Sequence, residues 1–167
     1  AKDLMISLEL FSLIDKVLPL EDAKEQEKET ETEKFESGMF SCKEITYSLY
    51  DCKEKKEIKD ILEDESLAKQ THDSKHFFSE CLKNDIDVKN IDFDTMLAAY
   101  LLDPSAKGYD VQNLFEEHGV NTFNSLVQKL DKKITECGQS TLLKKIELPL
   151  AKVLSEMEHA GFCVDVD

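Results

Sequence analysis

The order of apolar spacings along the chain constrains its fold more strongly than any other feature. Residues 39–50 (MFSCKEITYSLY) are rich in aromatic and β-branched side chains and are broken by polar, turn-like positions, which favours short β-strands. From residue 57 onward, apolar side chains recur at three- and four-residue steps, which is the spacing of amphipathic helices. Strands followed by helices predict an α/β domain, at the border with α+β, with a small sheet.

Capping residues set the expected helix boundaries, because Asp and Asn side chains accept hydrogen bonds from the N–H groups of a first turn and glycine commonly follows a last turn. Pro149 either kinks the last helix or marks its true start. The expected helices cover residues 57–67, a segment capped by Asp73, a segment capped by Asp94 or Asp92 and followed by Pro104, residues 110–118 before Gly119, a segment from Asn121 to 134 closed by Gly138, and residues 141–159.

Two segments precede the strands. Residues 4–18 place leucine, isoleucine and phenylalanine on one helical face and predict an amphipathic helix. Residues 20–36 are dense in glutamate and almost free of apolar side chains, so they cannot bury enough surface to offset the entropy of ordering. This second stretch is predicted to be an acidic linker.

Composition excludes several classes of protein. The chain has 167 residues, enough for one domain with its flanks, and its net charge of -15 disfavours DNA binding, which needs cations against phosphates. The five cysteines have no zinc-site spacing and indicate reduced, mostly buried thiols. Without a membrane-span candidate or a signal-peptide pattern, we expect a soluble cytoplasmic protein.

Two strings in the second half of the chain are specific. Residues 93–104 read FDTMLAAYLLDP, and residues 146–161 read IELPLAKVLSEMEHAG. Together, and in this order, they resemble family A DNA polymerases of the bacterial polymerase I type. In that family the first string is a helix of the 3′-5′ exonuclease domain, and the second opens the polymerase domain.

The resemblance implies a domain organisation. Residues 1–19 would be the end of the 5′-nuclease domain or its connector, and 20–36 the acidic linker. Residues 37–138 would form a vestigial 3′-5′ exonuclease-like domain of the ribonuclease H-like fold, with a small, reduced mixed sheet packed by helices. Residues 139–167 would be the first helix and turn of the polymerase domain. Each of these ranges is an expectation.

The resemblance also places the catalytic motifs of active editing domains, which hold two divalent metal ions with four carboxylates. Their three motifs are Asp-x-Glu on the first strand, Asn-x-x-aromatic-Asp on a helix and Tyr-x-x-x-Asp on a later helix. The first motif occurs nowhere in this chain, so the first strand itself is in question. Hard cations need several oxygen ligands, and the loss of one is expected to be severe.

Counting from the two strings places the degenerate positions of the remaining motifs. In the second motif, Asp73 takes the Asn position and Phe77 takes the position of the metal-binding Asp. In the third motif, Leu114 and His118 take the Tyr and Asp positions. The resemblance therefore predicts no catalytic residue, no metal ligand and no cofactor in this chain.

Other patterns have weaker interpretations. Residues 90–94 match the second motif as a bare pattern, but Asp94 is better interpreted as part of the 93–104 string and as a helix cap. Residues 47–51 match the third motif, but they precede everything that this motif should follow. His72 and His76 could be a metal pair, although solvent-facing helix polarity is the preferred interpretation. His118 could replace a carboxylate ligand, but a C-terminal helix residue favoured by the macrodipole is preferred.

The predicted function is that of a piece of DNA polymerase I, a protein of DNA replication and repair, with a catalytically inactive exonuclease-like domain in a structural role. Magnesium and DNA would belong to the parent polymerase, and the piece itself would bind DNA negligibly, pack on the polymerase palm or form a dimer, and contact no membrane. One alternative is an active, divergent 3′-5′ exonuclease that uses Asp73, Asp92 and Asp94 with a metal ion. Another is a non-enzymatic protein-interaction module on the same fold.

Overall fold

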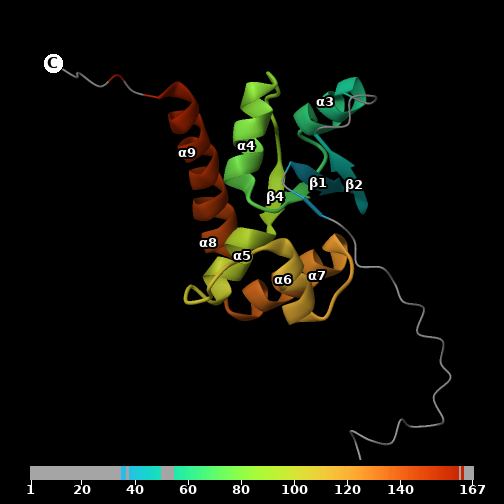
Figure 1. Ribbon diagram of the computed structural model, residues 1–167, viewed down its shortest axis with the longest axis vertical. Coiled ribbons are helices and arrows are strands. Elements are labelled where there is room, and N and C mark those ends of the chain that lie inside the picture. Colours follow the sequence, from blue (N-terminus) through green and yellow to red (C-terminus); the bar gives the residue numbers. More distant parts are fainter. Residues whose placement is uncertain (1–34, 37, 50–54, 162, 164–167) are drawn as a thin grey trace, which may run out of the picture. The chain divides into compact units, whose positions relative to one another are not determined.

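A mixed sheet of four short strands forms the centre of the domain. The computed structural model describes residues 35–36, 38–49, 55–161 and 163 (Figure 1). The strand order is β2-β1-β3-β4. β1 (Met39–Cys42) pairs antiparallel with β2 (Ile45–Ser48) and with β3 (Lys69–Thr71), whereas β3 pairs parallel with β4 (Ile91–Asp94). The parallel pair requires a crossover connection, which the helix between these two strands supplies.

The β1–β2 hairpin confirms the strands expected from residues 39–50. Its two-residue loop places Lys43 at φ 50° and Glu44 at φ 66°. Two consecutive residues of positive φ give the backbone twist that matches the right-handed twist of paired strands. On the hairpin, Phe40 stacks on Tyr47 with ring centroids 5.2 Å apart.

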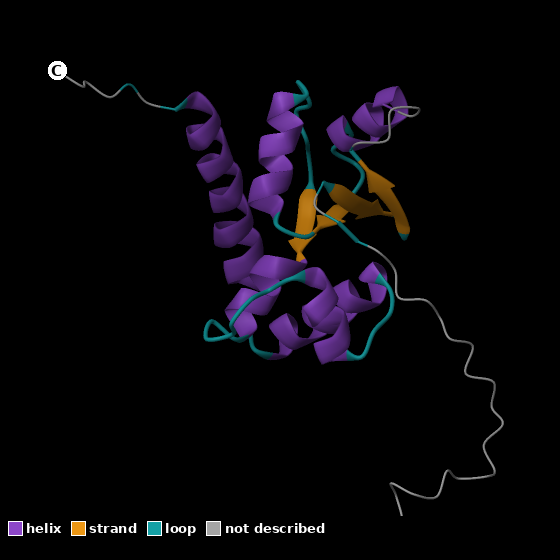
Figure 2. Ribbon diagram, viewed as in Figure 1, coloured by secondary structure: helices purple, strands orange, loops and turns teal. Residues whose placement is uncertain are grey.

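Helices account for most of the remaining described residues (Figure 2). They follow the expected order, and Asp73, Asp94 and Asp110 cap three of them through their side chains. The helices are α3 (Lys55–Glu63), α4 (Ser74–Lys83), α5 (Thr95–Leu102), α6 (Val111–His118), α7 (Phe123–Glu136), α8 (Ser140–Leu142), the π-helical η1 (Leu143–Glu147) and α9 (Leu148–Ala160).

The predicted cap of α7 is wrong by one residue. Thr122, not Asn121, is the N-cap: its backbone is extended (φ -130°, ψ 148°) and its side chain accepts a hydrogen bond from the N–H of Ser125. Both residue types cap helices, so sequence preference does not separate neighbouring candidates. The packing of Phe123, the first helical residue, which is fully buried, fixes where α7 begins.

The last helical run is continuous from Ser140 to Ala160, with a wide π turn in its middle. Leu148 donates its N–H to the carbonyl of Leu143, a five-residue step. Pro149 follows at once and has no N–H to donate to the residue four positions earlier. A π turn commonly relieves such an interruption, so Pro149, at the start of α9, is accommodated within a continuous helical run.

Two hydrophobic clusters make up the core. The first lies among α5, α6 and α7 and includes Phe35, which is 2 % exposed and stacks on Phe123 with ring centroids 3.7 Å apart. The second lies among the sheet, α3, α4 and α9. Residue 35 falls in the stretch predicted to be a linker, yet it is packed into the domain. The predicted helix at residues 4–18 and the stretch 20–34 lie outside the described residues.

α9 packs with its small residues inward. Leu148, Ala151 and Ser155 are buried on the side of α4, beside which α9 runs in Figure 1. The opposite side, which we call the outer stripe, consists of large apolar residues that are between 39 and 64 % exposed. They are Ile146, Leu150, Val153, Leu154 and Met157. The structure leaves these five side chains exposed, because α4 accepts the opposite face of α9.

Two of the cysteines are core residues. Cys42 and Cys81 are buried free thiols, whereas Cys137 and Cys163 are exposed and Cys52 lies outside the described residues. Burial raises the pKa of the Cys81 thiol to about 12, so this thiol is unreactive at neutral pH. Among the described helices, none combines the length and the apolar character needed to cross a membrane.

Candidate functional site

The carboxylate of Asp94 connects two turns of the chain. Asp94 is the last residue of β4, is fully buried and caps α5 by accepting the N–H groups of Met96 at 2.7 Å and Leu97 at 3.2 Å. The same carboxylate accepts the N–H of Asp73 at 3.2 Å and that of Ser74 at 2.6 Å. Four backbone donors from the starts of α4 and α5 therefore converge on one buried charge.

This site lies where the two parallel strands end. In open α/β sheets, ligands bind beyond the carboxyl ends of parallel strands, so this edge is the natural place for a functional site. Asp73 adopts a left-handed conformation (φ 57°) and its side chain accepts the N–H of His76 at 3.2 Å. Asp tolerates this conformation better than most residues because its short side chain bonds locally. Asp73 is thus occupied as the cap of α4.

His72 lies beside these carboxylates. Its Nδ1 is 2.8 Å from the hydroxyl of Thr95, and it precedes α4 instead of belonging to it. The interpretation of His72 as a solvent-facing helix residue is therefore wrong, while His76 is exposed on α4. Burial lowers the pKa of His72, although the charges of Asp94 and Asp73 act in the opposite direction.

Phe77, which the resemblance places at the position of the family's metal-binding Asp, is a core residue. It is fully buried and meets the ring of Phe40 edge-on, with centroids 5.7 Å apart. The ring fills space between α4 and the sheet in the second cluster. A carboxylate at this position would need polar partners, and the side chains around Phe77 in that cluster are apolar.

Leu114 and His118, the positions carried over from the third motif, lie on α6. Leu114 is buried in the first cluster, so the structure places it in a different core from Phe77. His118 is 7 % exposed, with Nδ1 3.3 Å from the ammonium nitrogen of Lys133. Burial, and then Lys133, lower the pKa of His118, which favours the neutral ring. His118 is the last residue of α6, as expected, and its carbonyl accepts a hydrogen bond from Lys129.

The three carboxylates of the alternative nuclease site do not converge as free ligands. Asp73 and Asp94 accept backbone N–H groups, and Asp92 pairs with Lys144 at 2.8 Å. Within the described ranges, no group of three His, Cys, Asp or Glu residues could hold a metal ion. The described strands also carry no Asp-x-Glu. The residues that the structure describes do not fit the two metal ions of an active editing domain.

Sequence reasoning missed two features of this region. It predicted Asp94 as a cap of its own helix but not as the acceptor for the turn before α4. It also missed Lys69, a fully buried β3 residue whose ammonium group donates to the carbonyls of Asp64 at 2.5 Å and Lys89 at 2.7 Å. Burial lowers the pKa of Lys69. No local pattern marks either contact, because both join segments some twenty residues apart in the chain.

A small mixed sheet with helices packed around it, and with turns joined at the ends of its parallel strands, defines an α/β domain of the ribonuclease H-like class. The model of the family described as "DNA polymerase I, ribonuclease H-like domain" matches residues 25–128. The chain belongs to this family.

Two curated relatives agree with this assignment. DNA polymerase I of Bacillus subtilis (strain 168) is 27 % identical over 142 residues, covering 66 % of this chain and 16 % of the relative. DNA polymerase I of Caldicellulosiruptor bescii is 33 % identical over 128 residues, covering 66 % of this chain and 15 % of the relative. The chain thus spans about a sixth of the length of these relatives. No solved structure matches it significantly.

Replacing Asp94 by Asn should lower the free energy of unfolding by about 3 kcal/mol, because an amide offers one acceptor where four N–H groups converge in a buried place. Urea unfolding measures the change. Asp92→Asn is the matched control, and because its partner is an exposed lysine it should cost less than about 1 kcal/mol. Equal effects of the two substitutions would contradict the role given to Asp94.

Acid should destabilise the domain through His72 and His118. Since the pKa of each is lowered in the folded state, the unfolded state takes up more protons as the pH falls below the ordinary value of 6.5, and stability present above that value is lost. Each can contribute a slope of up to about 1.4 kcal/mol per pH unit. Urea unfolding between about pH 5 and 7 should show a smaller slope in His72→Gln and His118→Gln than in the unsubstituted chain. Identical slopes in all variants would be the contrary result.

Proposed function

We propose that this domain is a non-catalytic, structural part of a bacterial DNA polymerase I. In this proposal the parent protein is a cytoplasmic, magnesium-dependent DNA-directed DNA polymerase of replication and repair, and it contacts DNA through its other parts. In this proposal the domain has no metal-dependent 3′-5′ exonuclease activity. Its role is to space the neighbouring domains and to support the polymerase domain.

One observation carries the proposal of inactivity. By the resemblance, Phe77 takes the place of a metal-binding Asp, and its ring is buried against Phe40 in the core. The position therefore contributes to packing and offers no oxygen ligand to a metal ion. Asp73 and Asp94, two of the three carboxylates that the active alternative would use, are helix caps. A two-metal mechanism needs carboxylates free to bind both ions, and each that the alternative would use has a protein partner.

The charge of the chain supports the same conclusion. Its net charge is -15, and the neutralisation of phosphates by Lys and Arg supplies most of the affinity of a protein for single-stranded DNA. We therefore expect negligible DNA binding by this chain alone. An active exonuclease would have to bind its substrate strand against this charge.

Incubation of the 167-residue chain with a 5′-labelled single strand should leave the strand intact in magnesium or manganese. Magnesium should also leave the melting temperature unchanged, because a ligand stabilises only through a site in the native state. Asp73→Ala and Asp92→Ala are the diagnostic variants. Metal-dependent shortening of the strand that either variant abolishes would establish the active alternative and reject the proposal.

The outer stripe of α9 supports the structural role. Its five residues form a continuous apolar surface on the face turned away from α4, and large exposed apolar patches commonly mark interaction sites. The match covers 16 % of one relative and 15 % of the other, so most of a polymerase I lies outside the matched region. We infer that the stripe packs on the palm of the same polymerase, with the fragment dimer as the alternative.

Leu150→Ser combined with Met157→Ser should leave the melting temperature of the 167-residue chain within about 2 °C, because both side chains are exposed. In the whole polymerase the same pair should lower the melting temperature and increase cleavage by a protease. Lys107→Ser with Lys132→Ser is the exposed control. If the double substitution leaves the whole enzyme unaffected, packing of the stripe on the polymerase is rejected. If the 167-residue chain sediments as a dimer and the substituted chain as a monomer, self-association through the stripe is favoured.

A further inference from the structure

A groove beside β4 is lined by three lysines, each of which also lies within 4.0 Å of a carboxylate outside the groove lining. It has a volume of about 280 Å³ and lies between α4, the segment leading into β4, and the start of α9. Three lysines line it, namely Lys89, Lys144 and Lys152, and none of the described lining residues is acidic. Its floor is apolar, with Val88 and Leu148 buried and Ile91 partly exposed.

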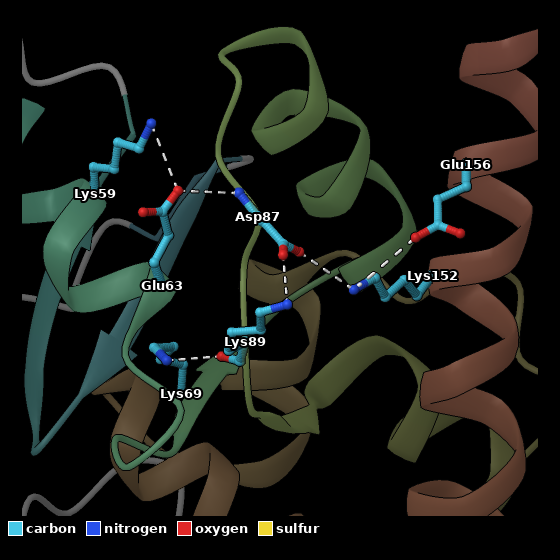
Figure 3. A network of polar contacts seen from close by, with 7 residues as sticks. All are labelled: Lys59, Glu63, Lys69, Asp87, Lys89, Lys152 and Glu156. Carbon is cyan, nitrogen blue, oxygen red and sulfur yellow. Dashed lines mark hydrogen bonds and ion pairs between the residues drawn. The ribbon is translucent and has the colours of Figure 1, made fainter.

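The lysines surround the apolar floor. Lys144, Leu148 and Lys152 follow one another at four-residue steps, which places them in one row along the helical run. Lys89 lies across the groove from this row, in the segment before β4. Figure 3 shows that the ammonium groups of Lys89 and Lys152 both approach the carboxylate of Asp87. An apolar group in the groove would thus have a cation at either end and a third across from it.

These cations can be shared with a ligand. Lys152 is 3.7 Å from Asp87 and 4.0 Å from Glu156, both beyond hydrogen-bonding distance. Lys144 pairs with Asp92 at 2.8 Å, but both side chains are more than two-fifths exposed. Exposed ion pairs of this kind contribute about 0–1 kcal/mol, so an incoming carboxylate can replace or join the internal partner at little cost.

The network in Figure 3 keeps the groove in shape. Asp87 accepts hydrogen bonds from Lys89, and its N–H donates to Glu63 at 3.3 Å. Beneath it, buried Lys69 donates to the carbonyl of Lys89. The wall that carries Lys89 is therefore tied to α3 and β3, and a ligand would meet cations that are already positioned.

The apolar floor of the groove favours an acidic peptide over single-stranded nucleic acid as its anionic ligand. Single-stranded nucleic acid binds to proteins by stacking its bases on exposed aromatic or guanidinium planes. The one ring in the groove, Phe78, is only 6 % exposed, and the other apolar lining residues are aliphatic. We propose that this groove binds an acidic peptide segment of a partner protein, in which an aliphatic side chain flanked by carboxylates covers Ile91 and Leu148. This proposal does not depend on whether the domain is catalytic.

The test uses the whole 167-residue chain and a fluorescent peptide, acetyl-Glu-Asp-Leu-Asp-Glu-amide. Fluorescence anisotropy should show salt-sensitive binding that K144Q combined with K152Q weakens about tenfold. The matched control, K107Q with K132Q, removes the same charge from exposed positions outside the groove and should leave the affinity unchanged. Circular dichroism melting confirms that both variants are folded.

A second measurement locates the peptide without substitution. Methyl resonances of Val88, Ile91 and Leu148 should shift on titration, while those of Val111 and Leu130 in the first core cluster should not. The proposal is rejected by the absence of binding, by equal losses in the two double variants, or by methyl shifts elsewhere. It is rejected equally if oligo(dT) binds at the groove more tightly than the peptide, or if exchanging the peptide leucine for serine changes nothing.

Discussion

A single buried carboxylate holds together the part of the fold on which the rest depends. Asp94 receives N–H groups from the first turns of both α4 and α5, so its charge is balanced by the positive ends of two helices and not by a cation. This contact fixes the ends of β3 and β4 against each other. It also sets the direction in which α4 leaves the sheet, and therefore what α4 can present to the core and to α9.

The placement of α4 bears on the function of the domain. With Asp73 and Asp94 both engaged as caps, the edge where an α/β sheet commonly binds ligands is filled by internal hydrogen bonds. One turn further along α4, Phe77 completes the core against Phe40. The residues at the family's second motif thus stabilise the fold, which is the basis for proposing a structural role in the polymerase.

The second face of α4 receives α9, and this contact creates both candidate interaction surfaces. Because α4 accepts the small side of α9, the large apolar side chains face outward as the outer stripe. The same docking brings Lys144 and Lys152 next to Lys89 and so forms the lysine groove. Lys75 and Glu158, 2.6 Å apart, add an ion pair across the two helices. The helical run from Ser140 to Ala160 therefore contributes to both proposed interaction surfaces, the outer stripe and the lysine groove.

The sequence alone determined the features that are local. Helical spacing and the caps Asp73, Asp94 and Asp110 located the helices, aromatic and β-branched residues located β1 and β2, and two strings identified the family. Tertiary structure decided the rest. β3 and β4 are three and four residues long, too short for their sequence to predict a strand, and their stability comes from pairing with distant segments. The lowered pKa of His118 depends on burial and on Lys133 of another helix, and the buried side of α9 depends on the shape of α4, neither of which a local pattern encodes.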